Sequence, residues 1–404
     1  MKEFFTTKKS LWIVIPLLIL GGLLVINKSA QQADKLSPPT TIPPTQQALV
    51  PAAPTTATAP VHTPAPPEDF VHLAWFYKPP EEGQLNLVAQ NFNFFILTYK
   101  DEKERDRLKA LGVKAPFSEY LLFQTINDPG SCDATPSGNQ VAFKAGDFCQ
   151  ISKMHPDWFL LDQNGNRIQS GSSSYFMDPG NEGFRQFWLE RARELQETYG
   201  WDSIFLDNVE ASRSKLLNKG ESLPKYPDDA SYQRAVEGFL DYIRRNYFEP
   251  RGRLMYGNIV SEGNDPAWDQ YLKYLDGAMI ESFATDWSDG YRSKDDWEQQ
   301  MEQVEKTLAQ GKTLILVAQG QQEDLELQKF AFASYLLVNN GDAVFRYTNA
   351  NSYRNVWLYD NYGLNIGMPV GNRYKENGGW RRDFSNGYVM VDPGKHTAEI
   401  VVNK

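Results

Sequence analysis

The stretch Gly200–Glu210, with the sequence GWDSIFLDNVE, decides how this chain folds. Its mainly apolar run Ser203–Leu206 is followed directly by Asp207. A short run of this kind is typical of a strand buried in a parallel sheet. Helical patterns lie on both sides of it, at Phe184–Tyr199 and Tyr232–Tyr247. We therefore expect a strand that is joined to its neighbours by helical crossovers.

The same alternation of strand and helix patterns continues along most of the chain. Apolar runs followed by helices predict a parallel sheet, and eight repeats favour a closed (β/α)8 TIM barrel over an open, doubly wound sheet. No GxGxxG motif follows a predicted strand, which counts against a dinucleotide-binding fold. The predicted strands are 70–76, 92–98, one within 113–123, 203–206, 254–256, 278–280, 313–318 and 343–345, and the predicted helices are 82–91, 101–111, 184–199, 232–247, 265–275, 294–310 and 322–338.

The N-terminal part is predicted to lie outside the folded domain. Lysines precede the apolar run Leu11–Ile26, which predicts a single membrane-spanning anchor with a cytoplasmic N-terminus and an extracytoplasmic domain. A cleaved signal peptide, which would give a secreted protein, is the alternative. The segment 30–67 is rich in Pro, Thr and Ala without hydrophobic periodicity, so we expect a disordered linker.

These patterns divide the chain into four parts. The last of them contains FSNGYVMVDPG (Phe384–Gly394), in which strand-like alternation surrounds an Asn-Gly and a Pro-Gly turn. We therefore predict a small β-rich extension after the barrel. The predicted parts are a cytoplasmic tip with a transmembrane anchor (1–29), a linker (30–67), the barrel (68–350) and the β-rich C-terminal extension (351–404).

The segment 124–183 interrupts the alternation with a long stretch rich in Gly, Ser, Asn and Asp, and is predicted to be an irregular, functional loop. It holds the two cysteines of the chain, Cys132 and Cys149, and neither belongs to a CxxC pair. Outside the cytoplasm they are expected to form a disulfide that pins this loop. Two free, inert thiols are the alternative.

Composition and motifs exclude several kinds of function. The net charge is −10 and there is no long basic tract, so nucleic acid is not an expected partner. No Ser-His-Asp elbow, HExxH motif or metal-ligand spacing is present, so neither a metal nor a cofactor is expected. The aromatic fraction of 13% fits a sugar-binding cleft, and fits a large aromatic core equally well.

Two carboxylates directly follow apolar strand patterns. Asp207 follows SIFL and Glu281 follows AMI, and both are predicted to reach the C-terminal rim of the barrel, where active sites of this fold lie. Hydrolysis of a glycosidic bond needs two such groups, one to protonate the leaving oxygen and one to attack the sugar or activate water. We predict Asp207 as nucleophile or base and Glu281 as general acid. A salt bridge at the rim is the alternative for each, with Glu119 and Glu210 as reserve candidates.

Other polar or aromatic residues near the predicted strand ends are candidates for substrate binding. Single aromatic residues among them could equally serve packing, and Asp178, in a DPGN turn before a helix, could equally serve turn and capping chemistry. The candidates are Trp75, Tyr99, Asp178, Asn208, Tyr256, Asn258, Trp287, Gln319, Arg346 and Tyr347.

Four segments in this order resemble a known family: HPDWFLLDQNGNRI (155–168), YFMDPGNEGFRQFWLERARE (175–194), GWDSIFLDNVE (200–210) and WRRDFSNGYVMVDPG (380–394). Together they resemble hypothetical glycoside hydrolase family 15, and the resemblance spans roughly 70–395. It implies a TIM barrel whose catalytic-type Asp falls on Asp207. The similar endo-α-1,4-galactosaminidase barrels pair such an Asp with a Glu after a later strand, which falls on Glu281.

Three functions follow as hypotheses. The first is a glycoside hydrolase that cleaves an extracellular or cell-envelope polysaccharide by two-carboxylate catalysis. The alternative is a non-catalytic, membrane-tethered barrel that binds glycans, which would need the aromatic and amide groups but not both carboxylates. A third is a protein-interaction scaffold of the envelope, which would have a rim filled by loops.

Overall fold

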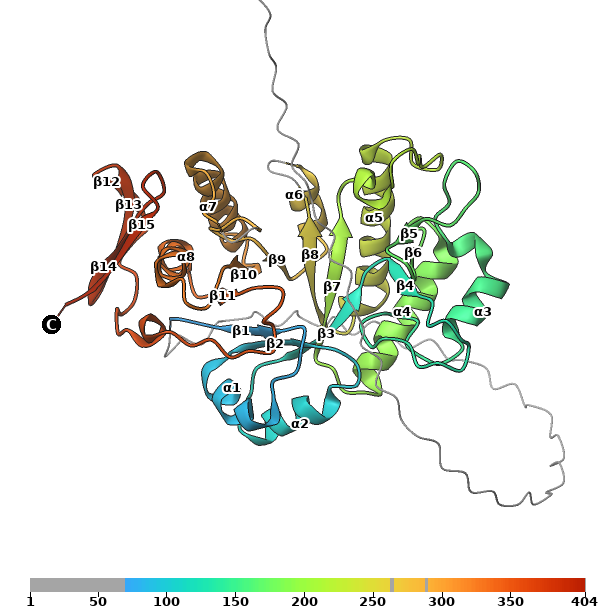
Figure 1. Cartoon of the computed structure of the whole chain (residues 1–404), viewed down its shortest axis with the longest axis horizontal. Helices are drawn as coiled ribbons and strands as arrows, with labels where there is room; N and C mark the ends of the chain where they lie inside the picture. Colours follow the sequence, from blue (N-terminus) through green and yellow to red (C-terminus); the bar gives the residue numbers. More distant parts are fainter. Residues whose placement is uncertain (1–69, 262–264, 288–289, 404) are drawn as a thin grey trace, which may run out of the picture. The chain divides into compact units, whose positions relative to one another are not determined.

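The computed structural model describes residues 70–261, 265–287 and 290–403 (Figure 1). Their main feature is an eight-stranded parallel sheet in the order β1-β2-β3-β7-β8-β9-β10-β11. A parallel bridge between Leu73 and Phe345, with Phe345 N donating to the His72 carbonyl at 2.8 Å, joins the first strand to the last. The strands are β1 (Ala74–Phe76), β2 (Phe94–Leu97), β3 (Phe117–Leu122), β7 (Ser203–Glu210), β8 (Leu254–Val260), β9 (Gly277–Ile280), β10 (Thr313–Gln319) and β11 (Ala343–Thr348).

Helices connect successive strands of this sheet, and several begin at side chains that cap them. Asn181, Asp228, Ser293 and Asp324 each accept a hydrogen bond from a backbone N–H of the first helical turn, which otherwise lacks a partner. The helices of the barrel are α1 (Leu85–Asn91), α2 (Glu102–Ala110), α4 (Glu182–Glu197), α5 (Asp229–Ile243), α6 (Ala267–Leu272), α7 (Lys294–Leu308) and α8 (Leu325–Val338). Short helical turns lie at Glu82–Gln84, Pro156–Trp158, Arg213–Leu216, Arg244–Phe248 and Asp360–Gly363.

Side chains of the strands divide into two cores. Successive strand residues point to opposite faces of a sheet, so Phe205 lies in the core inside the barrel while Ile204 and Leu206 lie in the core between strands and helices. The inner core also contains Phe76 and Met279. The predicted barrel is therefore confirmed, and its C-terminal rim is the place where inward-facing polar residues can meet.

The predicted end of the fourth barrel strand is wrong. Strand β7 continues past Leu206 to Glu210, with a register shift between Leu206 and Val209. Asn208 lies within this shift and has a left-handed backbone, with φ at 55°. Asp207 thus sits in a β-bulge inside a strand, and bulges of this kind re-aim side chains near active sites.

The segment 124–183 is more regular than predicted. It contains a helix, α3 (Asp147–Met154), and a small sheet in the order β4-β6-β5, formed by Thr125–Asn127, Ser174–Phe176 and Gln169–Ser170. Cys132 and Cys149 form a disulfide within it. An ion pair between Arg191 and Asp147 connects α3 to α4, beside which Figure 1 shows this lobe.

The predicted β-rich extension is confirmed as a four-stranded antiparallel sheet that packs on α8. Arg382 is buried between them and donates to the carbonyls of Leu336 and Asn339. Phe384 and Val389 fill the same interface. The strands are β12 (Tyr374–Glu376), β13 (Gly379–Phe384), β14 (Gly387–Asp392) and β15 (Thr397–Val402).

The predicted anchor and linker, within residues 1–67, lie outside the described residues. Among the residues that are described, no helix is both long and apolar enough to cross a membrane.

Candidate active site

Asp207 lies at the barrel mouth and is held by two side chains from the neighbouring strands. Its Oδ2 accepts a hydrogen bond from the hydroxyl of Tyr120 on β3 at 2.6 Å, and its Oδ1 accepts one from Nδ2 of Asn258 on β8 at 3.1 Å. The residue is 7% exposed. It takes part in no ion pair with another described residue, so the predicted alternative of a salt bridge does not apply to it.

Glu281 directly follows β9 and is held in a similar way. Its Oε1 accepts from the hydroxyl of Tyr77 at 2.9 Å, and its Oε2 accepts from Nδ2 of Asn258 at 2.9 Å. Asn258 therefore donates to both carboxylates from one nitrogen. Since that nitrogen lies 3.1 Å from one oxygen and 2.9 Å from the other, Asp207 Oδ1 and Glu281 Oε2 are at most about 6 Å apart.

Burial and mutual repulsion set the protonation of the pair. Burial, followed by the negative charge of Asp207, raises the pKa of Glu281 to about 7, against the hydrogen bonds from Tyr77 and Asn258. Burial also raises the pKa of Asp207, and donors from Tyr120, Asn258 and the backbone N–H of Asn208 oppose this rise. Two carboxyl groups this close do not both ionise easily, which favours a state with one proton on the pair.

Three tyrosines form an aromatic wall beside the carboxylates. The Tyr77 ring lies 4.9 Å from that of Tyr120 and 5.1 Å from that of Tyr353, measured between ring centroids. Tyr77 lies one residue past β1 and has a positive φ of 71°, and its N–H donates to the Ile96 carbonyl at 2.8 Å. Tyr120 and Tyr353 remain partly exposed to solvent. Such rings, next to two carboxyl groups, suit the stacking and hydrogen bonding of a sugar.

The sequence over residues 133–388 matches hypothetical glycosyl hydrolase family 15. The chain belongs to this family. The resemblance that the motifs indicated is thereby confirmed, as is the assignment to the glycoside hydrolases. The family match covers the segment that carries Asp207, Asn258 and Glu281.

Several solved structures are similar to this member of the family. The glycoside hydrolase domain of PelA from Pseudomonas aeruginosa is 16% identical, with 71% of this chain and 97% of that one covered and a TM-score of 0.47. The maltogenic α-amylase AmyB from Thermotoga neapolitana is 12% identical, with 80% of this chain and 85% of that one covered and a TM-score of 0.48. Similarity at this level says nothing about activity. No curated protein matches the chain by sequence.

Four of the predicted binding residues of this family member lie near the carboxylates or on the same rim of the barrel. They are Asn258, Asn208, Gln319 and Trp287. Gln319 Nε2 donates to the backbone carbonyl of Glu281 at 2.8 Å, so it holds the backbone of that residue rather than its carboxylate. Asn208 is exposed beside Asp207 in the bulge. Trp287, in the connection after β9, is 45% exposed and available for stacking.

Trp75 and Arg346 do not act as predicted. Trp75 is fully buried and its indole N–H donates to the Lys78 carbonyl at 2.7 Å, so its ring cannot stack on a sugar. Arg346 lies over that ring and donates to the carbonyls of Phe76 and Tyr353. Burial lowers the pKa of Arg346 to about 9. It is a packing residue that fixes Tyr353 in the aromatic wall.

Three further predicted binding residues serve packing outside the mouth. Tyr347 is buried and points to the helical layer, where its hydroxyl donates to the Gln321 carbonyl. Tyr99 packs against the rings of Phe143 and Tyr199. Tyr256 is inside the barrel below Asn258, edge-on to Phe94, with 4% exposed.

Asp178 has a structural role at a turn. It is 2% exposed and accepts hydrogen bonds from Lys225, Tyr226 and the Gly180 N–H. The turn interpretation of this residue therefore fits, although the helix cap itself is Asn181.

Of the reserve carboxylates, Glu119 is fully buried and accepts from the N–H of Tyr99 on the outer side of the sheet. Its neighbour Tyr120 is the residue of β3 that points inward. Burial raises the pKa of Glu210 to about 7, with Lys215 lowering it and Asp207 adding to the rise. Glu210 is thus close enough to Asp207 to interact electrostatically, but it forms no hydrogen bond with the carboxylate of Asp207 or Glu281.

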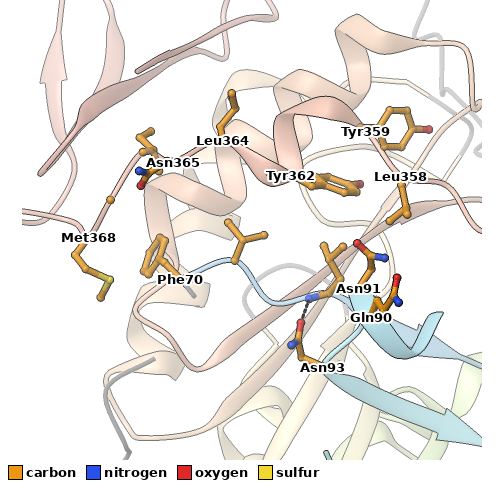
Figure 2. A pocket seen from close by; sticks show the side chains of 15 residues that line it. Phe70, Gln90, Asn91, Asn93, Leu358, Tyr359, Tyr362, Leu364, Asn365 and Met368 are labelled. Atoms are coloured by element: carbon orange, nitrogen blue, oxygen red, sulfur yellow. Dashed lines mark hydrogen bonds between the residues drawn. The ribbon is translucent and has the colours of Figure 1, made fainter. Parts of the chain in front are cut away.

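The hollow shown in Figure 2 is not at the barrel mouth. It has a volume of 560 Å³ and lies beside Phe70, Leu73 and Asn93, at the N-terminal ends of β1 and β2. Its other wall is the segment 358–368, and no Asp, Glu, His, Lys or Arg lines it. A site without such groups cannot supply two-carboxylate catalysis.

Within 70–261, 265–287 and 290–403, no group of three or more His, Cys, Asp or Glu side chains is arranged to hold a metal ion.

Proposed function

We propose that the barrel hydrolyses a glycosidic bond in a polysaccharide, with retention of anomeric configuration, through Asp207 and Glu281. The observation that carries the proposal is that Asn258 donates to both carboxylates from one nitrogen. This limits the facing oxygens to at most about 6 Å, whereas carboxyl groups lie about 5–5.5 Å apart in retaining and about 6.5–9.5 Å apart in inverting enzymes. A short separation favours direct attack by Asp207 over attack by a water molecule held between the two groups.

In the first half of the proposed reaction, an oxygen of ionised Asp207 attacks the anomeric carbon. The bond from that carbon to the leaving oxygen breaks, and Glu281 transfers its proton to that oxygen. The donors on Asp207 favour its carboxylate form, and burial beside a negative charge favours the protonated form of Glu281. Different environments thus give two similar groups different roles.

In the second half, water replaces the departed sugar. Glu281, now a carboxylate, takes a proton from the water. The oxygen of the water attacks the anomeric carbon, and the bond from that carbon to Asp207 breaks. The pKa of Glu281 is expected to fall while Asp207 is esterified, because the neighbouring negative charge is then absent. Both residues return to their initial states.

The aromatic wall of Tyr77, Tyr120 and Tyr353 is proposed to bind the sugar that is cleaved. The hydroxyls of Tyr77 and Tyr120 donate their hydrogen bonds to the carboxylates. Their rings are therefore fixed against the pair, and the partly exposed Tyr120 can offer a preformed face to a sugar ring.

We also propose that the domain works outside the cytoplasm, tethered through Leu11–Ile26. The disulfide between Cys132 and Cys149 supports an oxidising compartment.

The test is a screen of envelope and extracellular polysaccharides with the full chain. Released reducing ends are compared for the wild type, Asp207→Asn and Glu281→Gln. The proposal expects cleavage of at least one glycan by the wild type only. Cleavage that persists in both variants would overturn it.

A glycan-binding barrel without catalysis is the second candidate. It is favoured by one observation, namely that all four carboxylate oxygens of the pair accept hydrogen bonds from protein side chains. Binding of a glycan in the same screen by isothermal calorimetry, with no cleavage after prolonged incubation, would establish this function instead.

A further inference from the structure

We propose that Asn258 is a positioning residue that couples Asp207 and Glu281 into one titrating pair and assigns the proton of Glu281 to Oε1. The catalytic meaning of this inference rests on the proposed function, but the coupling itself does not. Asn258 lies on β8 between the two strands that carry the carboxylates, and only 5% of it is exposed.

The bulge in β7 brings Asp207 to Asn258. Leu206 pairs with Gly257 and Val209 pairs with Ile259, so Asp207 and Asn208 together oppose the single residue Asn258. On the other side, Asn258 pairs with Met279, two residues before Glu281. The extra residue is accommodated by the left-handed backbone of Asn208, a conformation that Asn adopts more readily than most residues. The strand register therefore aims both carboxylates at one amide.

A side-chain amide has two N–H bonds. Nδ2 of Asn258 directs one to Asp207 Oδ1 and one to Glu281 Oε2, so both are used. Because Oε2 already accepts a hydrogen, a proton on Glu281 belongs on Oε1. There the Tyr77 hydroxyl can accept it and turn its own hydrogen toward Met279 Sδ, which lies 3.2 Å away.

Other groups around the pair do not provide the same link. Burial and the nearby carboxylates raise the pKa values of Tyr77, Tyr120 and Tyr353, so these side chains stay neutral. Gln319 reaches only the backbone of Glu281. Among the described residues, Glu210 on β7 also interacts electrostatically with Asp207, Tyr256 on β8 lies below Asn258 inside the barrel, and Arg346 on β11 is bound to two carbonyls.

The test is a carbon-13 NMR titration of the full chain labelled at Asp and Glu carboxyl carbons. Asp207→Asn and Glu281→Gln assign the two signals. In Asn258→Ala, both midpoints are expected to rise by about one pH unit, because each carboxylate loses a donor that favours its charged form. Gln328→Ala, which removes a buried amide on α8 that pairs with Asn361 and touches neither carboxylate, is the matched control and is expected to leave both midpoints in place.

Asn258→Leu, similar in size and without donors, gives the same test if the alanine variant does not fold. Midpoints that stay unchanged in a folded Asn258 variant, or that move equally in Gln328→Ala, would overturn the inference. No substrate is needed for this measurement. A protein that shows the shift but cleaves no glycan therefore contradicts the proposed function and leaves the coupling intact.

Discussion

The Tyr77 hydroxyl donates to Oε1 of Glu281 at 2.9 Å, across a sequence separation of 204 residues. One residue follows β1 and the other follows β9, so closure of the barrel is what brings them together. The bond places an aromatic ring and the proposed acid in one rigid unit. Its loss should therefore change proton affinity at Glu281 more than it changes the fold.

Tyr77→Phe is expected to shift the pH dependence of cleavage upward. The hydroxyl favours the carboxylate form, so its removal raises the pKa of Glu281 above about 7 and keeps the acid protonated to higher pH. The alkaline limb of kcat/KM should move by about one pH unit. Tyr256→Phe, which removes a hydroxyl that does not touch the pair, is the control. An alkaline limb that stays in place or moves down would contradict this role of Tyr77.

Glu281→Gln is expected to be more stable than the wild type at alkaline pH. The folded pKa of Glu281 is raised from 4.5 to about 7, so the stability that protonation supplies is fully present below about 4.5 and is lost as pH rises through about 7. The difference should reach about 3 kcal/mol above that range. Urea unfolding at both ends of the range measures it.

The exposed Glu302→Gln serves as control for that measurement and should change stability equally at both ends of the range. A constant difference for Glu281→Gln across the range would show that Glu281 is not held in a proton-favouring environment.

Removal of the disulfide is expected to loosen the lobe of residues 124–183. The bond joins cysteines 17 residues apart, and closing a loop of this length is worth about 3 kcal/mol. Cys132→Ser with Cys149→Ser should lower Tm and make the segment between them the first site of limited proteolysis. Reduction of the wild type with dithiothreitol should reproduce both effects. Equal resistance of the reduced and oxidised forms would contradict a stabilising role.

The sequence predicted the fold well because its signals are local. Strand runs such as Phe94–Leu97 and residues 314–318 of β10 are apolar throughout, as is typical of buried parallel strands, and helices begin at recognisable caps. The segment 124–183 was predicted less well. Its strands are two or three residues long and pair across up to about fifty positions, which no local pattern reveals.

The candidate site was predicted in part, and the misses have physical causes. Asp207, Glu281 and Asn258 follow from the rule that polar residues at strand ends meet at one rim. Trp75 was predicted and Tyr77 was missed, because strand alternation does not show that the backbone is left-handed at Tyr77. Glu119 was predicted because it is a carboxylate, and Tyr120 was missed, although alternation from Phe117 places Tyr120 inward.

The most direct test of the account is to trap the proposed covalent intermediate on Asp207. The full chain is incubated with an activated 2-deoxy-2-fluoro glycoside of the sugar identified in the screen, then digested and analysed by mass spectrometry, while proton NMR follows the anomer first released from the natural glycan. The account predicts a glycosylated peptide that contains Asp207, no adduct in Asp207→Asn, and a product with the configuration of the substrate. A product of inverted configuration, or an adduct on another residue, would contradict it.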